Sequence, residues 1–232
     1  MNSRLVAIII SAVLLNFIVS VYGVDERTGN NVCSLSFQES GRTLGNGTQD
    51  KNGVCQETFM GEIPDFNHMV TTIIVFPKNN DVIEANRNFT FKQLIKNMNT
   101  GFFDDPAKEY YKFPQTLDKD GFIQGHSHVT IQKLDGEDQA PDPRVFAFFK
   151  GLNERAVNDI LSVVVGSDKK EGLDPGYYRA CTMTSSFGHQ PTLMPVAQRG
   201  AQDDCVRFTV QKDANKKRSI RSGIKKVKRR NK

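Results

Sequence analysis

The sequence predicts a mainly β protein, an antiparallel β-sandwich with at most one or two short helices and with stabilising disulfides. From Met69 onward, short runs rich in Val, Ile, Phe and Thr recur between clusters of Gly, Pro and Asp. Regularly spaced short strands with turn signals are typical of sandwiches. The chain also has four cysteines and no CxxC pair, which favours two disulfides over a zinc site. Its length suits one domain with a core large enough to fold alone.

The strands are expected in six segments, which are residues 70–77, 121–134, 145–151, 159–166, 176–185 and 204–211. A helix is predicted at residues 89–99, where apolar residues recur at helical spacing and Gly101 follows as a stop signal. An extended segment would fit the same residues. The residues that set the spacing are Phe91, Leu94, Ile95 and Met98. A run of aromatic residues is predicted to lie in the core, namely Phe146, Phe148 and Phe149.

The chain divides into four predicted parts. Residues 1–23 have the basic, apolar and small-residue regions of a signal peptide cleaved near Gly23, although the apolar run also reaches the lower length limit of an uncleaved anchor. Residues 24–68 are rich in Gly, Asn, Ser and Thr, which predicts a loop-rich segment held by the first disulfide. Residues 69–211 are the β-rich domain, and residues 212–232 are a basic tail. No later stretch is apolar enough to span a membrane, so a secreted, extracellular protein is expected.

Two local signals fit entry into the secretory pathway, namely N-glycosylation sequons and an even number of cysteines. Asn46 and Asn88 each begin an N-glycosylation sequon. Four cysteines allow three pairings, and we favour the pairing that closes two short local loops. It joins Cys33 to Cys55 and Cys181 to Cys205. On a chain-entropy argument, closing loops of this size stabilises the fold by roughly 3 kcal/mol each.

The tail differs in charge from the rest of the chain. From Gln211 onward there are eleven Lys or Arg and one Asp, so this segment carries +10 and the remainder −5 of the overall +5. Two basic clusters supply most of it, namely Lys216, Lys217 and Arg218, then Lys225, Lys226, Lys228, Arg229 and Arg230. So polar a segment is expected to be disordered. Three interpretations of the tail stay open. It could be a solvated terminus, or it could be a nuclear-localisation signal or an arm for an anionic surface or polymer, used after delivery into a host cell. It could also be a substrate for proteases that cut dibasic pairs.

The stretch GFIQGHSHVTIQKL holds two histidines one residue apart. Because alternate residues of a strand share a face, His126 and His128 are expected to project together, while Val129 and Ile131 point to the core. His189 is the expected third ligand, from a loop, and three histidines would suit Zn²⁺ or Cu²⁺. The alternative interpretation is that the pair lies on a partly exposed sheet face and binds no cofactor.

The sequence contains no recognised catalytic motif. It lacks a GxSxG elbow, an HExxH pair, a P-loop and a GxGxxG turn. A cupin site needs a glutamate shortly after the second histidine, where this chain has Gln and Lys, and a copper histidine brace needs an N-terminal histidine, whereas cleavage leaves Val24. Asp203 and Asp204 are adjacent and therefore point to opposite faces, so a turn or an ion pair with Arg199 is expected there.

Six motifs occur in order between residues 113 and 210: FPQTL, GHSHVTIQ, FAFFKGLN, PGYYRACTM, HQPTLMPVAQRG and DDCVRFTV. Together they resemble a family of secreted fungal proteins of unassigned function, over about residues 70–210. This resemblance implies a fungal source and an extracellular location, and it supplies no reaction. The signal sequence, sequons, cysteines and basic clusters also resemble those of the rust transferred proteins, fungal effectors delivered to host plants and linked to protease inhibition.

The expected function is therefore binding. The chain is predicted to be a secreted fungal protein whose partner is an unknown extracellular protein or polysaccharide, in its most specific form a host-directed effector with a protease-inhibitor-like role. Two alternatives stay open: a metal-binding protein or metalloenzyme that uses the histidine cluster, and a structural component of the cell wall or matrix.

Overall fold

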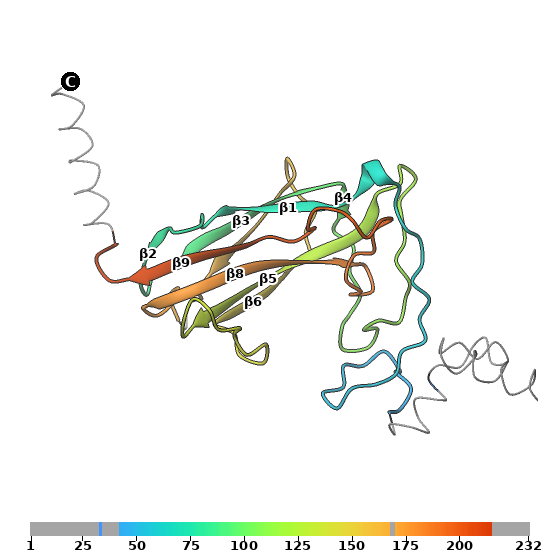
Figure 1. The fold of residues 1–232 in the computed structure, drawn as a ribbon, viewed down its shortest axis with the longest axis horizontal. Helices are drawn as coiled ribbons and strands as arrows, with labels where there is room; N and C mark the ends of the chain where they lie inside the picture. The colour runs from blue at the N-terminus through green and yellow to red at the C-terminus, as the bar shows by residue number, and fades with distance from the viewer. Residues whose placement is uncertain (1–32, 34–41, 168–169, 215–232) are drawn as a thin grey trace, which may run out of the picture. The chain divides into compact units, whose positions relative to one another are not determined.

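The computed structural model describes Cys33 and residues 42–167 and 170–214 (Figure 1). Within these residues the chain forms two compact units. The smaller unit contains Cys33 and residues 42–45 and 50–57, and the larger contains residues 46–49, 58–167 and 170–214. The predicted signal peptide and both basic clusters of the tail lie outside the described residues.

The smaller unit is a short looped segment tied by a disulfide between Cys33 and Cys55. The Cys55 backbone nitrogen donates to the carbonyl oxygen of Thr43 at 2.8 Å, and the Gly45 nitrogen donates to the Cys55 carbonyl at 2.8 Å. Leu44 and Cys55 form an isolated β-bridge. The predicted partner of Cys33 is therefore confirmed.

The larger unit contains one 3₁₀ turn and nine strands in its described residues. They are η1 (Phe66–His68), β1 (Thr71–Phe76), β2 (Val82–Glu84), β3 (Phe89–Lys96), β4 (Met98–Thr100), β5 (Ile123–Leu134), β6 (Phe148–Leu152), β7 (Ile160–Val165), β8 (Gly176–Ser186) and β9 (Cys205–Gln211). The six predicted strands correspond to β1, β5, β6, β7, β8 and β9. The mainly β fold class is confirmed, and no helix in the described part of the chain is long and apolar enough to cross a membrane.

The strands form two sheets. One has three antiparallel strands in the order β1-β3-β7, and the other has six, in the order β2-β9-β8-β5-β4, with β6 also paired to β5 (Figure 1). Most pairings are antiparallel, as predicted, but β2 with β9 and β4 with β5 are parallel. The long strands β5 and β8 form the centre of the larger sheet.

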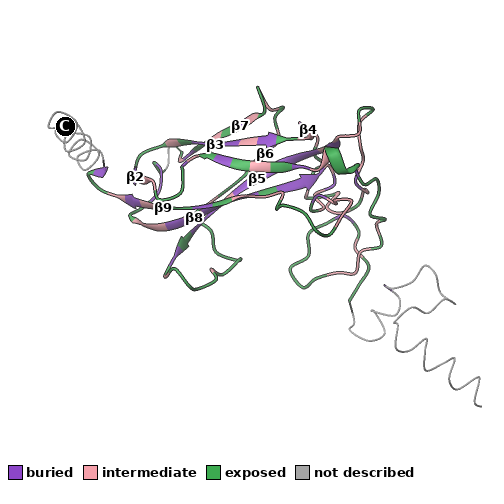
Figure 2. Ribbon diagram, turned by 45° about the horizontal axis from the view of Figure 1, so that its top comes forward, coloured by how far each residue is buried: buried purple, intermediate pink, exposed green. Residues whose placement is uncertain are grey.

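A single apolar core joins the two sheets. The smaller sheet contributes Ile74, Phe91, Ile95, Leu161 and Val165, and the larger contributes Ile123, Val129, Ile131, Ala180, Val206, Phe208 and Val210. These core residues recur at every second position, because alternate residues of a strand point to the same face of the sheet. Along β5 and β8, residues of both faces are buried over most of the strand (Figure 2). Fully burying one large aliphatic or aromatic side chain stabilises a fold by about 1.5–3 kcal/mol, so this shared core holds the sandwich together.

The helix predicted at residues 89–99 is wrong. These residues form β3 and β4, and β3 pairs with β1 on one side and β7 on the other. Phe91, Gln93 and Ile95 are buried on one face with a period of two. The sequence shows helical spacing because Leu94, on the opposite face, is also apolar. The backbone of β3 instead forms hydrogen bonds with the strands on both sides, which stabilises the extended conformation.

The prediction for the aromatic run is wrong for two of its three residues. Phe146 is 55% exposed and Phe149 is 45% exposed, whereas Phe148 packs against the core. The strand β6 begins at Phe148, so Phe146 precedes the sheet, and alternation turns Phe149 to the outer face. Phe149 thereby lies on the same side of the larger sheet as the histidines of β5.

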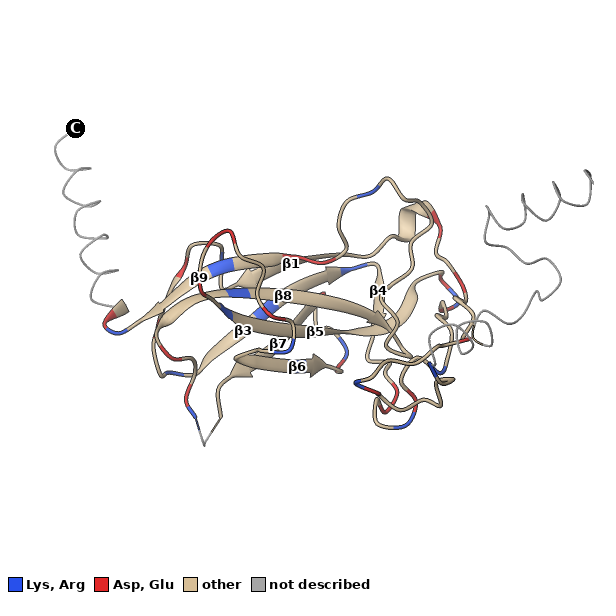
Figure 3. Cartoon of the chain, turned by 60° about the horizontal axis from the view of Figure 1, so that its bottom comes forward, with Lys and Arg blue, Asp and Glu red and all other residues tan. Residues whose placement is uncertain are grey.

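A second disulfide connects adjacent strands of the larger sheet. Cys181 of β8 and Cys205 of β9 are directly opposed in register, with their Cα atoms 4.2 Å apart. The predicted pairing is therefore confirmed for this bond too. Charged residues lie mostly in the loops at the ends of the strands, with few on the sheets themselves (Figure 3).

Candidate metal centre

His126 and His128 lie on the outer face of β5, opposite the core residues Val129 and Ile131. In the pairing with β8, His126 is opposed to Ser185 and His128 to Met183. The strands come unusually close here, because a Cβ atom added at Gly125 would lie 2.1 Å from the carbonyl oxygen of Ser185. Any residue other than glycine would force β5 and β8 apart just before the first histidine.

His189 reaches the same place from the turn that follows β8. Its backbone nitrogen donates to the carbonyl of Ser186 at 3.0 Å, and the Ser186 nitrogen donates to the carbonyl of Gln190 at 2.8 Å. His189 has a φ of 71°, a left-handed conformation in which histidine is enriched relative to most non-glycine residues. The Tyr111 nitrogen donates to the carbonyl of Gly188 at 3.0 Å, which fixes this turn from the segment between β4 and β5.

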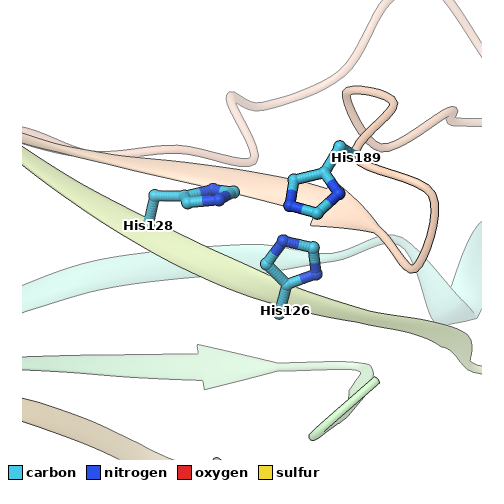
Figure 4. Close-up of side chains that lie close together, drawn as sticks. All are labelled: His126, His128 and His189. Carbon is cyan, nitrogen blue, oxygen red and sulfur yellow. The ribbon is translucent and has the colours of Figure 1, made fainter. Parts of the chain in front are cut away.

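The three imidazoles converge (Figure 4). Each offers a nitrogen atom, and these three atoms lie within 4.8 Å of one another. The ring centroids of His126 and His128 are 4.7 Å apart, those of His126 and His189 are 4.5 Å apart, and those of His128 and His189 are 5.6 Å apart. Small rotations of the side chains would bring three nitrogens to the bonding distance of a metal ion, about 2.0–2.1 Å for zinc and nitrogen.

Two of the three histidines are buried, and His189 is partly buried. His126 is fully buried and His128 is 8% exposed, so the expectation of a partly exposed face is wrong for this pair. His126 Nδ1 lies 3.0 Å from the Phe102 carbonyl oxygen, and His128 Nδ1 lies 3.3 Å from the Met183 carbonyl oxygen. A carbonyl only accepts, so both Nδ1 atoms carry the proton and both Nε2 atoms keep a free lone pair.

Two buried ring nitrogens in the cluster have no hydrogen-bond partner among the described residues, His126 Nε2 and His189 Nδ1. Leaving a buried polar atom unsatisfied costs about 1–3 kcal/mol. Histidines that bind metals characteristically donate the other ring N–H to a backbone carbonyl or carboxylate, which fixes the tautomer and aims the lone pair. His126 has this arrangement.

Burial also keeps the cluster uncharged. Desolvation, followed by the neighbouring His128 and His189, lowers the pKa of His126 to about 3. Desolvation, with His128, lowers the pKa of His189 to about 4, and desolvation lowers the pKa of His128. The folded protein thus presents three neutral imidazoles near neutral pH, the protonation state that coordinates metals.

A pocket of about 380 Å³ opens beside the cluster. His128 and His189 line it, together with Gln49, Pro106, Tyr110, Tyr111, Phe149, Met183, Thr184, Ser185, Pro191 and Asp203. Tyr110 stacks on Tyr111 with ring centroids 4.0 Å apart and lies 5.9 Å from His189, and Phe149 stacks on His128 at 5.4 Å. His126 is therefore at the closed inner end, and the pocket gives access to the other two histidines.

Asp203 lies in a bend just before β9, in keeping with the turn that was one of the two expectations for it, and it also lines the pocket. Its carboxylate accepts hydrogen bonds from the Thr184 nitrogen at 2.8 Å and from the Thr182 hydroxyl at 3.0 Å. The expected ion pair with Arg199 is not formed, and Arg199 donates to the carbonyl of Val196 instead. Burial raises the pKa of Asp203, while its hydrogen bonds oppose this shift.

The aromatic wall of the pocket, formed by Tyr110 and Tyr111, was also not predicted from the sequence. Tyr110 and Tyr111 are adjacent, which on a strand would place them on opposite faces. They lie instead in the segment between β4 and β5, where Tyr111 has a φ of 57° and the two rings stack. The pair of tyrosines in the sequence was the available signal for this wall.

Comparison with known proteins identifies the family. Residues 72–211, more than half of the chain, match the family described as the CLU5d N-terminal domain. The chain belongs to this family. It is 42% identical over 192 residues to "Pathogenicity cluster 5 protein d" of the fungus Colletotrichum graminicola. The aligned region covers 81% of this chain and 38% of the relative, so the chain spans about two fifths of that protein's length. The predicted membership of a fungal family is confirmed, over nearly the residues that carried the resemblance.

Proposed function

We propose that this chain is a metal-binding protein that holds one transition-metal ion between His126, His128 and His189. The observation that carries the proposal is the orphaned, buried Nε2 of His126, in a cluster where one ring nitrogen of each of the three histidines lies within 4.8 Å of the other two. A bound metal ion would satisfy this atom, and the carbonyl of Phe102 already fixes the tautomer that exposes its lone pair.

The donor set restricts the metal. Three imidazoles suit Zn²⁺, copper and related first-row ions, whereas Ca²⁺ and Mg²⁺ prefer oxygen ligands. Because the rings are neutral in the folded protein near pH 7, binding there needs no prior loss of a proton. The pocket beside His128 and His189 would leave a further coordination position for water or another ligand.

The biological setting of this binding is also part of the proposal. The related Colletotrichum protein is named for a pathogenicity cluster, which supports a virulence-associated role for this chain. Two disulfides support export into an oxidising compartment, consistent with a signal peptide ending near Gly23. N-terminal sequencing of protein from fungal culture medium should begin near Val24; protein with an intact Met1 in the cytosol would refute export.

The metal proposal is tested by calorimetric titration of protein dialysed against EDTA, with Zn²⁺ and with Cu²⁺ at pH 7. We expect saturable binding of one ion per chain for at least one of these metals. His126→Asn keeps a donor for the Phe102 carbonyl and removes Nε2, so it should lose at least tenfold in affinity while remaining folded.

The chain supplies its own control for the titration. His68 is the fourth of its four histidines and lies outside the cluster, beside Asp65 and Phe122. His68→Asn should bind the metal as the unmodified protein does. If the unmodified protein binds neither Zn²⁺ nor Cu²⁺ and also fails to bind Cu⁺ under ascorbate, or if the two variants lose affinity equally, the histidine cluster is not the site.

A further inference from the structure

The histidine cluster supplies three ligands and leaves the identity of the fourth open. Among the described residues, the group of His, Cys, Asp and Glu side chains able to share one ion contains only the three histidines. Asp203 lines the same pocket but is not in that group, and its carboxylate accepts bonds from Thr182 and Thr184. Among the described residues, the cluster therefore has no carboxylate or thiolate ligand.

Met183 is positioned to act as a fourth ligand. It is the residue of β8 directly opposed to His128, and it lines the pocket with His128 and His189. Opposed residues of an antiparallel pair share a face with Cβ atoms about 4.5–5.5 Å apart, and an unbranched thioether side chain adapts easily to its surroundings. Met183 is 44% exposed, so packing in the core does not explain its position.

Charge also distinguishes the metals that such a site can hold. Three imidazoles and a thioether are all neutral, so the site brings no negative charge to offset that of the ion. Burying a charge without compensation is costly, which disfavours Zn²⁺ and Cu²⁺ relative to the singly charged Cu⁺. Thioether sulfur is, in addition, a soft ligand that favours Cu⁺.

We propose that Met183 is the fourth, specificity-determining ligand and that the site binds Cu⁺ in preference to Zn²⁺. This inference rests on the proposed histidine site and adds the ligand that selects the metal. In this arrangement the Met183 sulfur would bind the ion from the side of the pocket, which the aromatic rings of Phe149 and Tyr110 also line.

The experiment measures the affinity for Cu⁺ by competition with a Cu⁺ chelator under ascorbate, and for Zn²⁺ by competition with a zinc chelator. Ascorbate is chosen over a thiol reductant, which would exchange with the two disulfides. Met183→Leu keeps the size of the side chain and removes the sulfur. Met60→Leu, at a 63% exposed methionine that does not line the pocket, is the matched control.

We expect Met183→Leu to weaken Cu⁺ binding at least tenfold, to change Zn²⁺ binding less than twofold, and to remove the directly bound sulfur seen by copper X-ray absorption. Met60→Leu should change none of these. If the histidines bind metal but Met183→Leu leaves the Cu⁺ affinity and the sulfur signal intact, the inference about Met183 is refuted and the histidine site stands. If neither ion binds to the unmodified protein, both proposals fail.

Discussion

Acid should destabilise the metal-free protein through its buried histidines. The pKa of His126 is about 3 in the folded protein, against about 6.5 for an exposed histidine. The unfolded chain therefore binds a proton at this residue between pH 6.5 and 3, while the folded chain does not. Stability is fully present above pH 6.5 and falls as the pH drops towards 3.

The size of this effect follows from the pKa difference. Each pH unit well below 6.5 removes about 1.4 kcal/mol per proton, and the unfolded histidine is half protonated at pH 6.5, so lowering the pH from 6.5 to 4.5 should cost roughly 2 kcal/mol from His126 alone. His189, with a pKa of about 4, acts in the same direction. Typical domains are stable by about 5–15 kcal/mol, so this loss is readily measured.

Urea denaturation in EDTA across this pH range provides the assay. His126→Asn has no titrating group there, while its side-chain amide can still donate to the Phe102 carbonyl. The free energy of unfolding of the unmodified protein should fall by roughly 2 kcal/mol more than that of the variant between pH 6.5 and 4.5. Parallel curves for the two proteins would show that His126 is protonated as easily in the folded state as in the unfolded state, and would refute its desolvation.

Three further predictions concern stability and the tail. Ile131→Ala should destabilise the fold by about 2–5 kcal/mol, because it opens a cavity at a fully buried position of β5; a loss under 1 kcal/mol in urea denaturation would contradict the core described above. Replacing Cys181 and Cys205 together by alanine should cost roughly 3 kcal/mol, since the bond closes a loop of 24 residues, and an unchanged melting temperature would speak against this. Truncation after Ala214 removes ten of the 31 Lys and Arg residues, so retention on heparin should fall while circular dichroism stays unchanged; unaltered retention would exclude the tail as the anionic-polymer arm.

Much of the sheet structure was predictable because its sequence signals are local. β5 and β9 alternate apolar and polar residues, so their core faces follow directly from the sequence. β3 was not predictable in the same way, because Leu94 completes a helical pattern and only pairing with β1 and β7 decides for the strand. Parallel pairings such as that of β2 with β9 depend on long-range contacts that no local pattern reports.

For the candidate site, too, local sequence patterns predicted one part, and the rest depends on long-range contacts. Alternation predicted that His126 and His128 project together, but their burial depends on the segment between β4 and β5, which supplies the Phe102 carbonyl. The position of His189 depends on a turn with a left-handed residue, which the sequence does not specify. Met183 could be paired with His128 only once the register of β5 and β8 was known.

The most direct test of the metal site is anomalous diffraction from crystals of the protein loaded with copper or zinc, recorded at the absorption edge of that metal. The proposed histidine site should give one strong peak per chain within bonding distance of ring nitrogens of His126, His128 and His189. A peak bound to other residues, or no peak in protein that chelator competition shows to be loaded, would contradict it.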